Sequence, residues 1–279
     1  MFNAKILADS TSFGVCDHTT SRIITAQLTF PRCILAEFNT HKSIARNAAS
    51  SRAIPISKMM KDVQEKPFVP IHWGKNQKGM QAYEELDSDS ITKCASIWLD
   101  ARDRALEYVE QLTKVGLHKQ IANRLLEPWM WVTVIATGNM AAWNNFLALR
   151  AHEAAEPHMQ KIAYLLKDEI ITSQTNNLIP GQWHLPLIGF PGDQFLFIED
   201  KIKISVGRVA RVSYLTHDGI RDPSADIELH DRLINSGHFS PTEHVAMAST
   251  QTDKGGNLGA GWCQYRKTLK GEFQTEGVL

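Results

Sequence analysis

The stretch RIITAQLTFPRCILAEFNTHK, Arg22–Lys42, predicts the centre of the fold. Apolar and polar side chains alternate over residues 22–30, which is typical of a half-buried β-strand, and the apolar positions are Ile24, Ala26, Leu28 and Phe30. Pro31 ends this strand, because proline lacks the N–H that a strand ladder needs. Ile34, Leu35 and Phe38 then recur at helical spacing and predict a short helix.

The segment after this helix, NTHKSIARNAASSRAIP, gathers cationic or ionisable side chains without any acid among them: His41, Lys42, Arg46 and Arg52. The whole chain is neutral, with 30 Lys+Arg against 30 Asp+Glu. A local basic cluster on a neutral chain favours a discrete anionic ligand over a nucleic-acid polymer or an anionic membrane.

The composition is that of a globular protein with a sizeable core, since 43% of its 279 residues are hydrophobic and 22% are charged. Apolar runs such as WMWVTVIA are shorter than a bilayer span, and MFNAKILADSTSFG lacks the apolar core of a signal peptide. We therefore expect a cytoplasmic location and no membrane partner. The cysteines are widely separated and form no CxxC pair, which predicts reduced thiols: Cys16, Cys33, Cys94 and Cys263.

Further helices are predicted from apolar spacing and capping residues, at 90–115, 118–126, 140–152, 158–172 and 223–236. Segments 54–88 and 173–200 are rich in Pro, Gly and Trp, and we expect them to be irregular. Residues 201–279 contain one good helix, which is a thin core for an independent domain, so a single domain over 1–279 is favoured. The sequence contains no GxGxxG after a strand, no GxxxxGK[ST], no HExxH and no GxSxG.

Three later segments carry polar side chains where a core would exclude them. The residues concerned are Arg124; then Asn139, Asn145 and Arg150; then Ser213, His238, Ser240 and Glu243. Ordinary structural roles remain open for all of them. The arginines could pair with a neighbouring Glu, Asn139 could cap a helix, His238 and Ser240 could be turn or cap residues, and Glu243 with His244 could be a solvated face. We expect no metal, because the spacing H-x-S-x-x-E-H does not match zinc ligation.

Four groups of residues keep a fixed internal spacing. Thr40-His41-Lys42 is followed, after seven intervening residues, by Ser50, Ser51 and Arg52. Asn139 precedes the run NNFLALRA, residues 144–151, while ARVS spans 210–213 and GHFSPTEH spans 237–244. Together these motifs resemble the flavin-dependent thymidylate synthase family, in which the first motif reads Arg-His-Arg, seven residues, Ser, a further residue and Arg.

The order of the motifs differs from that of the family, where ARV-S and G-H-x-S/T-P-x-E-H precede the Arg-His-Arg element. The sequence therefore resembles a circularly permuted member, with the cut between Val245 and the strand that begins at Arg22. The resemblance implies an α+β fold: one domain in which a mostly antiparallel sheet is flanked by long helices.

The resemblance also implies an activity, which is the reductive methylation of dUMP at C5. Methylenetetrahydrofolate supplies the carbon, reduced FAD the hydride, and NADPH regenerates the flavin; the family uses no cysteine nucleophile and forms homotetramers. By position the catalytic residues would be His41, Ser50, Arg52 and Arg150. The nucleotide would contact Glu37, Thr40, Ser50, Ser51, Arg52, Arg124 and Arg150, although matching from Gly116 selects Asn123 instead of Arg124. FAD would contact His41, Lys42, Asn139, Asn145, Ser213, His238, Ser240 and Glu243.

Departures from the family pattern leave alternatives open. Thr40 and Lys42 stand where the family has arginines, Glu37 where it has Gln, and Ala141 where it has Arg. Because a carboxylate only accepts hydrogen bonds, Glu37 could select cytosine, which would make dCMP the substrate. Transfer of a hydroxymethyl group without flavin reduction, and a non-catalytic nucleotide-binding protein, are further alternatives. A bacterial and a viral source, the latter placing the protein in host cytoplasm, are both compatible with this sequence.

Overall fold

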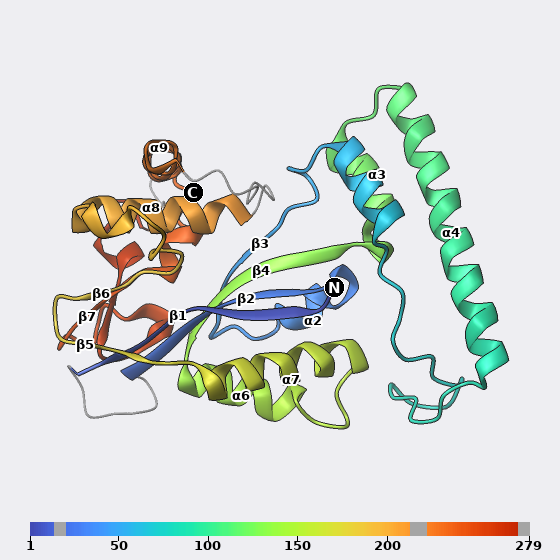
Figure 1. Cartoon of the computed structure of the whole chain (residues 1–279), viewed down its shortest axis with the longest axis horizontal. Coiled ribbons are helices and arrows are strands. Elements are labelled where there is room, and N and C mark those ends of the chain that lie inside the picture. The colour runs from blue at the N-terminus through green and yellow to red at the C-terminus, as the bar shows by residue number, and fades with distance from the viewer. Residues whose placement is uncertain (14–20, 213–221, 273–279) are drawn as a thin grey trace, which may run out of the picture.

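A five-stranded sheet forms the centre of the computed structural model, which describes residues 1–13, 21–212 and 222–272 (Figure 1). The strand order is β3-β4-β2-β1-β5. β1 and β5 are parallel and the other pairs are antiparallel, so the prediction of a mostly antiparallel sheet is confirmed. The strands are β1 (Asn3–Ser12), β2 (Arg22–Pro31), β3 (Ala45–Ala48), β4 (Trp131–Asn139) and β5 (Asn176–Leu178).

The opening stretch of the sequence forms the middle of this sheet. β2 pairs with β4 over its whole length and ends at Pro31, as predicted, and the short helix α2 (Leu35–Phe38) follows it. The predicted alternation is confirmed over residues 26–30, where Gln27 and Thr29 are only half-buried, but both faces are covered at the start of β2, where Ile23 and Thr25 are fully buried as well. Its neighbour β4 overlaps the apolar run WMWVTVIA. A short apolar run of this kind fits a buried strand or a buried helix, and the sequence alone did not distinguish the two.

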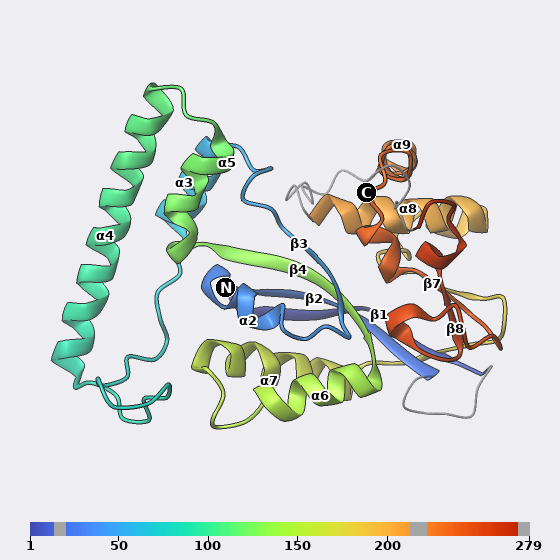
Figure 2. The same ribbon diagram turned by 180° about the vertical axis from the view of Figure 1, so that it is seen from behind.

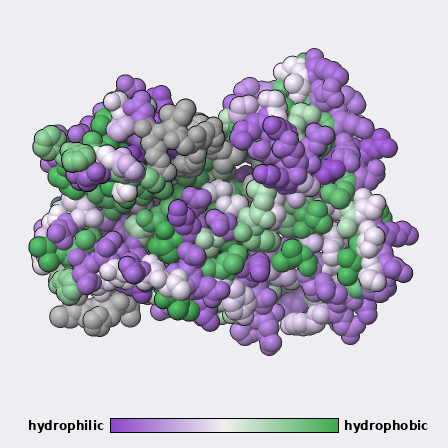
Figure 3. All heavy atoms as spheres, viewed as in Figure 1, coloured by the Kyte–Doolittle hydropathy of each residue, from purple (hydrophilic) through white to green (hydrophobic). Residues whose placement is uncertain are grey.

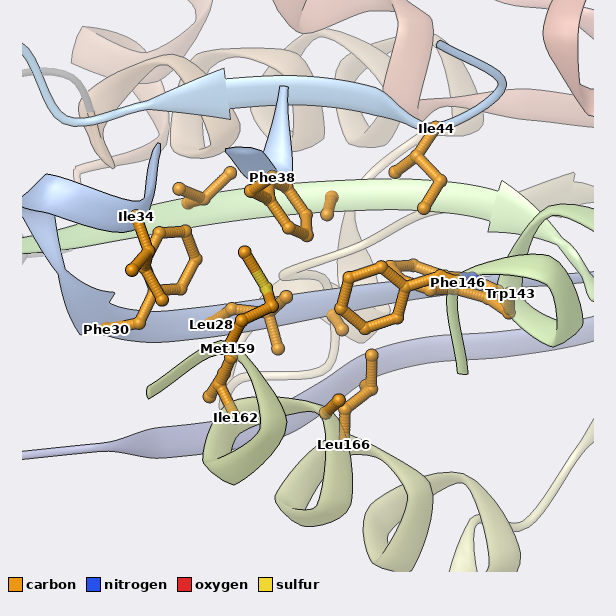
Figure 4. Packing of buried hydrophobic residues seen from close by; sticks show 14 of the residues in the cluster. Leu28, Phe30, Ile34, Phe38, Ile44, Trp143, Phe146, Met159, Ile162 and Leu166 are labelled. Atoms are coloured by element: carbon orange, nitrogen blue, oxygen red, sulfur yellow. The ribbon is translucent and has the colours of Figure 1, made fainter. Parts of the chain in front are cut away.

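Two helices cover one face of the sheet, α6 (Met140–Arg150) and α7 (Pro157–Thr172), as Figures 1 and 2 show. The apolar face predicted for the second of these helices packs on the sheet through Met159, Ile162, Ala163, Leu166 and Ile170. Figure 4 shows Met159, Ile162 and Leu166 of this helix converging with the aromatic rings of β2, α2 and α6. Removing these side chains from water supplies much of the free energy of folding, at roughly 25 cal/mol per Å² of apolar surface.

A second cluster lies at one end of the sheet, where α3 (Ile56–Glu65), α4 (Ser88–Lys114) and α5 (Lys119–Ala122) meet. The helix expected from residue 90 onward is α4, whereas the one expected at 118–126 is α5 followed by a 3₁₀ helix, Asn123–Trp129. The expectation that 54–88 is irregular was wrong for the residues of α3. The outward face of α4 is hydrophilic (Figure 3), and no helix among the described residues is apolar over a length that could cross a membrane.

The other face of the sheet is covered by α8 (Ile198–Arg211), which is packed against α9 (Pro223–Asn235). Val209 and Val212 contact Ile135 of β4, so successive residues of β4 face opposite layers. The sequence predicted α9 but not α8. Arg208 of α8 bonds both carboxylate oxygens of Asp193, at 2.7 and 2.9 Å, and also pairs with Asp226 of α9. These buried ion pairs fix the two helices to each other.

A smaller antiparallel sheet lies beside the first, in the order β6 (Trp183–His184), β7 (Ala246–Ala248) and β8 (Trp262–Gln264). A chain of buried hydrogen bonds connects it to the large sheet. His184 Nδ1 lies 2.9 Å from Ser10 Oγ and its Nε2 lies 2.8 Å from Thr25 Oγ1. Thr25 Oγ1 lies 2.7 Å from Thr137 Oγ1, which lies 2.8 Å from Nδ1 of His244.

One assignment of the protons satisfies the buried hydrogen bonds best. His244 Nε2 is buried and has no hydrogen-bond partner within the described residues. An unpaired lone pair is less costly there than an unpaired N–H, so we assign the His244 proton to Nδ1. Each hydroxyl then donates onward, Thr137 to Thr25 and Thr25 to His184. Burial lowers the pKa of both imidazoles to about 3, and the rings are neutral at pH 7.

Substituting Gly207 should test the close approach of α8 and α9. A Cβ at this position would lie 2.4 Å from the backbone oxygen of Asp226. Although alanine is the better helix former, Gly207→Ala should reduce the free energy of unfolding by about 1–3 kcal/mol, because backbone cannot move aside cheaply. Glu199→Ala, at an exposed position of the same helix, is the control. Equal stability of both variants in urea titrations would contradict the packing described.

The buried histidines should make stability depend on pH. Their pKa values lie near 3 in the folded protein and near 6.5 in an unfolded chain, so the unfolded state binds more protons between these values. The free energy of unfolding should therefore fall as the pH is lowered from 7 to 5, by about 2 kcal/mol per histidine at pH 5. His184→Gln should weaken this dependence in urea titrations.

The control for the pH dependence is His152→Gln, which removes an exposed imidazole and should leave the slope unchanged. A free energy of unfolding that stays constant between pH 7 and 5 would show that the buried rings titrate normally.

Candidate active site

The turn after α2 and the end of α6 enclose a small pocket of about 180 Å³. Five of the residues expected to bind substrate or flavin line it: Thr40, His41, Lys42, Asn145 and Arg150. The fold accounts for this, because β3 pairs with β4 so that Ala45 lies opposite Thr137, and the turn before β3 therefore lies beside the end of β4, where α6 begins. The apolar part of the wall is Ile44, Ala142 and Leu149.

Arg150 is held in this pocket by two side chains. Its Nη1 forms an ion pair with Glu37 Oε1, and its Nε donates to His41 Nε2 at 3.0 Å. The structural alternative noted for Arg150, pairing with a glutamate, is therefore present. Nη2 has no hydrogen-bond partner among the described residues, so two N–H donors remain available to a ligand.

His41 is a neutral acceptor in this arrangement. Burial lowers its pKa to about 4, and the nearby charges of Arg150 and Arg46 act in the same direction. Accepting from Arg150 at Nε2 places the imidazole proton on Nδ1. The ring is 7% exposed and packs edge-on against Phe146, which fixes its orientation. His41 therefore orients Arg150 rather than supplying a proton at neutral pH.

A second pocket, of about 340 Å³, adjoins the first at Lys42, which lines both. Glu243, one of the residues expected at the flavin, lies in its wall and forms an ion pair with Arg266. Arg46 contributes from β3, and its Nη1 donates to the backbone oxygen of His41 at 2.5 Å. Together the pockets form a polar groove along the turn between α2 and β3.

The remaining residues expected at the nucleotide lie beyond β3, at the end of the sheet that carries α3. Ser51 is buried and donates to Glu127 Oε1 at 3.0 Å, while Arg124 approaches the same oxygen at 3.9 Å. Ser50 is half-buried and Arg52 is exposed. β3 lies between Ser50 and His41, and none of these four residues lines the pocket of Arg150.

Asn123, the alternative to Arg124, has a structural role. It is fully buried and its amide donates to the backbone oxygens of Ser51 and Ile54. Of the two candidates at this position, Arg124 is the one whose side chain is exposed.

Three residues expected at the flavin lie apart from both pockets. Asn139 caps α6 and donates to the backbone oxygen of Leu258 at 3.1 Å, so its amide is used inside the fold. His238 is exposed and bonds Ser236, and Ser240 is exposed at the start of a 3₁₀ helix. Ser213 lies outside the described residues. His244, in contrast, is fully buried, so the interpretation of a solvated face was wrong for it.

Sequence reasoning missed two parts of this site. Glu127 holds Ser51 and also lies 3.4 Å from Arg32, but an acid in a short 3₁₀ helix gives no periodic signal. The C-terminal segment 256–272 lines the second pocket with Asn257, Gln264, Arg266 and Lys267. Its many glycines and charges matched no motif, and its position depends on pairing with β7.

The structure brings together the two places where the motif order is broken. Ala246, two residues after the end of GHFSPTEH, lies in one apolar cluster with Ile23, the second residue of β2. A chain passing from His244 into β2 would therefore need only a short connection. This proximity supports the proposed circular permutation.

Comparison with known proteins identifies the family. The model of Thy1, described as thymidylate synthase complementing protein, matches residues 13–173, which is more than half of the chain. No curated protein matches.

Two solved structures of the UMP/dUMP methylase PolB from Streptomyces cacaoi are similar to the chain. The structure with 5-Br dUMP shows 13% identity and a TM-score of 0.46, covering 60% of this chain and 89% of PolB. The structure with 5-Br UMP shows 15% identity and a TM-score of 0.49, covering 60% and 87%. The family match carries the assignment, because it includes both the Thr40–Arg52 motif and the Asn139–Ala151 motif. The chain therefore belongs to the Thy1 family of thymidylate synthase complementing proteins, the flavin-dependent thymidylate synthase family that the motifs indicated.

Proposed function

We propose that this protein is a flavin-dependent thymidylate synthase, which methylates dUMP at C5 with methylenetetrahydrofolate, reduced FAD and NADPH. The observation that carries the proposal is the fork of Arg150, held by Glu37 and His41 at the wall of a pocket beside Lys42. These residues lie within the segment that matches the family model. A guanidinium fixed on two sides is a preorganised donor for an anionic or carbonyl group.

The residues present fit part of a flavin dinucleotide. The two adjoining pockets measure about 180 and 340 Å³, and ligand sites commonly span about 300–1,000 Å³. Ile44 and Leu149 offer an apolar wall for a ring, while Lys42 and Arg46 offer charge for phosphates. When bound, the reduced flavin would supply the hydride of the reaction. The remainder of its surface would be covered by other subunits, and we propose a homotetramer for this reason.

In this proposal the chain's own residues bind and polarise the nucleotide. Arg150 donates from Nη2 to a pyrimidine carbonyl or the phosphate, and Asn145 lies in the same pocket wall. Donors at the carbonyls stabilise the negative charge that develops as C5 becomes nucleophilic. Ser50, Ser51, Arg52 and Arg124 lie at the other end of β3, so they would serve a nucleotide bound by a neighbouring subunit.

A cysteine nucleophile has no support in the described residues. Cys33 is exposed, Cys94 is half-buried and Cys263 is buried, and none of these three lines either pocket. Burial raises the pKa of Cys263, which makes its thiolate scarce at neutral pH. This agrees with methylation through a polarised pyrimidine.

Glu37 supports a second candidate substrate, dCMP. Its carboxylate is half-buried and pairs with Arg150 through Oε1. An ionised carboxylate beside the base would accept from the amino group of cytosine, whereas uracil offers a carbonyl at that position. A folate-dependent dCMP or dUMP methylase or hydroxymethylase on this scaffold is therefore the alternative activity, and a non-catalytic nucleotide-binding protein is the alternative without chemistry.

We further propose that residues 1–279 act as one cytoplasmic domain.

The activity is tested by presenting dUMP and dCMP side by side to the full-length protein with FAD, methylenetetrahydrofolate and NADPH. We expect a yellow protein that releases FAD on denaturation and converts dUMP to dTMP. Glu37→Gln, which restores an amide donor, should raise the ratio of dUMP to dCMP turnover by about tenfold. Turnover of dCMP alone would establish the alternative. A colourless protein that cannot be loaded with FAD would contradict the flavin-dependent reaction.

Arg150 can be tested independently of turnover. Arg150→Ala should weaken dUMP binding about 100-fold, and Arg150→Lys about tenfold, because lysine keeps the charge but cannot form the fork. Since the charge of Arg150 lowers the pKa of His41, Arg150→Ala should also move that pKa from about 4 toward 6.5, as measured by NMR. A His41 pKa that does not move would show that the two side chains are not in contact.

A further inference from the structure

The pocket of about 340 Å³ lies between two segments that are more than 200 residues apart in the chain. One wall is the turn and strand that carry Lys42 and Arg46, and the other is the C-terminal segment Gly256–Glu272. The second wall lies outside the part of the chain that matches the family model. The pocket therefore combines a family motif with a segment that matched no motif of the family.

The wall from the C-terminal segment is fastened in place by its polar side chains. Gln264 Nε2 donates to the backbone oxygen of Glu243 and to Asn257 Oδ1, each at 2.9 Å. Asn257 Nδ2 donates to the backbone oxygen of Ser43, in the turn before β3, at 3.2 Å. Arg266 is held by its ion pair with Glu243 and lies over the ring of Phe239 at 5.9 Å. The groups that face the pocket are thus oriented before any ligand arrives.

The charges around the pocket leave an excess of two positive charges. Arg266 pairs with Glu243, and Lys267 pairs with Glu272. Lys42 is exposed, and neither Lys42 nor Arg46 has an ion-pair partner in the described part of the chain. Such a pocket favours an anion with two negative charges, and guanidinium groups bind phosphate oxygens in particular.

We propose that this pocket binds the diphosphate of a nucleotide cofactor, with Arg46 and Arg266 as its donors from opposite walls. The inference rests on the proposed function for the identity of the cofactor, because the pocket adjoins the one at Arg150 through Lys42. Arg266 then supplies a guanidinium close to the motif in which Thr40 and Lys42 have replaced two arginines. FAD and NADPH both carry a diphosphate, so the chemistry alone does not distinguish them.

The test is calorimetric titration of the full-length protein with inorganic pyrophosphate. Arg266→Gln and Arg46→Gln should each weaken its binding about tenfold. Arg232→Gln, which removes an exposed arginine of α9, is the matched control and should change binding less than twofold. Thermal unfolding of each variant shows whether it is folded, and the two substitutions lie on separate walls, so a folding defect in one leaves the other informative.

Competition identifies the source of the diphosphate. Displacement of pyrophosphate by FAD or by NADPH, lost in Arg266→Gln, would support the site and show which cofactor it takes. Displacement by methylenetetrahydrofolate alone would overturn the assignment in favour of a carboxylate site. Pyrophosphate binding that is unchanged in both folded variants would also overturn it, even in a protein that binds FAD and methylates dUMP. If pyrophosphate binding depends on Arg266 but the protein does not methylate dUMP, the result would contradict the proposed function and still support the anion site.

Discussion

A hydrogen bond of 2.7 Å joins the hydroxyl groups of Thr25 and Thr137, and it lies where the large sheet meets the small sheet and the GHFSPTEH segment. The two threonines face each other across β2 and β4, and each also bonds a buried histidine, His184 or His244. One histidine belongs to the small sheet and the other to the GHFSPTEH motif. Polar groups buried this deeply are costly unless each finds a partner, so the register of the central strands and the seating of the two later segments are specified together.

The candidate site depends on the same junction. Thr137 pairs with Ala45 at the start of β3, so the turn with His41 lies beside the end of β4, from which α6 carries Arg150. Arg150 then connects Glu37 and His41, and its remaining donors face the pocket. Replacing arginine elsewhere in the motif, at Thr40 and Lys42, leaves this fork intact. The motif has thus kept its best-oriented donor while changing the charges around it.

Much of this arrangement could be predicted from sequence, for reasons that differ between elements. β2 and α7 have clear periodicity because the apolar face of each contributes to the same hydrophobic cluster. The helix α8 was missed because its buried side includes Ser205, Gly207 and Arg208, which read as polar until Asp193 and Asp226 are placed beside them. Motif spacing found His41 and Arg150, but it could not show that Ser50 and Arg52 lie beyond β3, nor that the C-terminal segment reaches Lys42. Those facts depend on tertiary contacts between distant segments.

The apolar cluster shared by Ile23 and Ala246 has a consequence for how the native state is specified. Packing energies depend on which side chains are in contact. They are the same whether the two segments in the cluster are joined by a short loop or are separate in the sequence. Moving the chain ends changes only the lengths of the loops that must close during folding, and the entropy of closure grows slowly with length. The order of the segments in such a protein can therefore be circularly permuted while the fold stays the same. Relationship to a family is then visible in the conserved contacts rather than in the order of the segments.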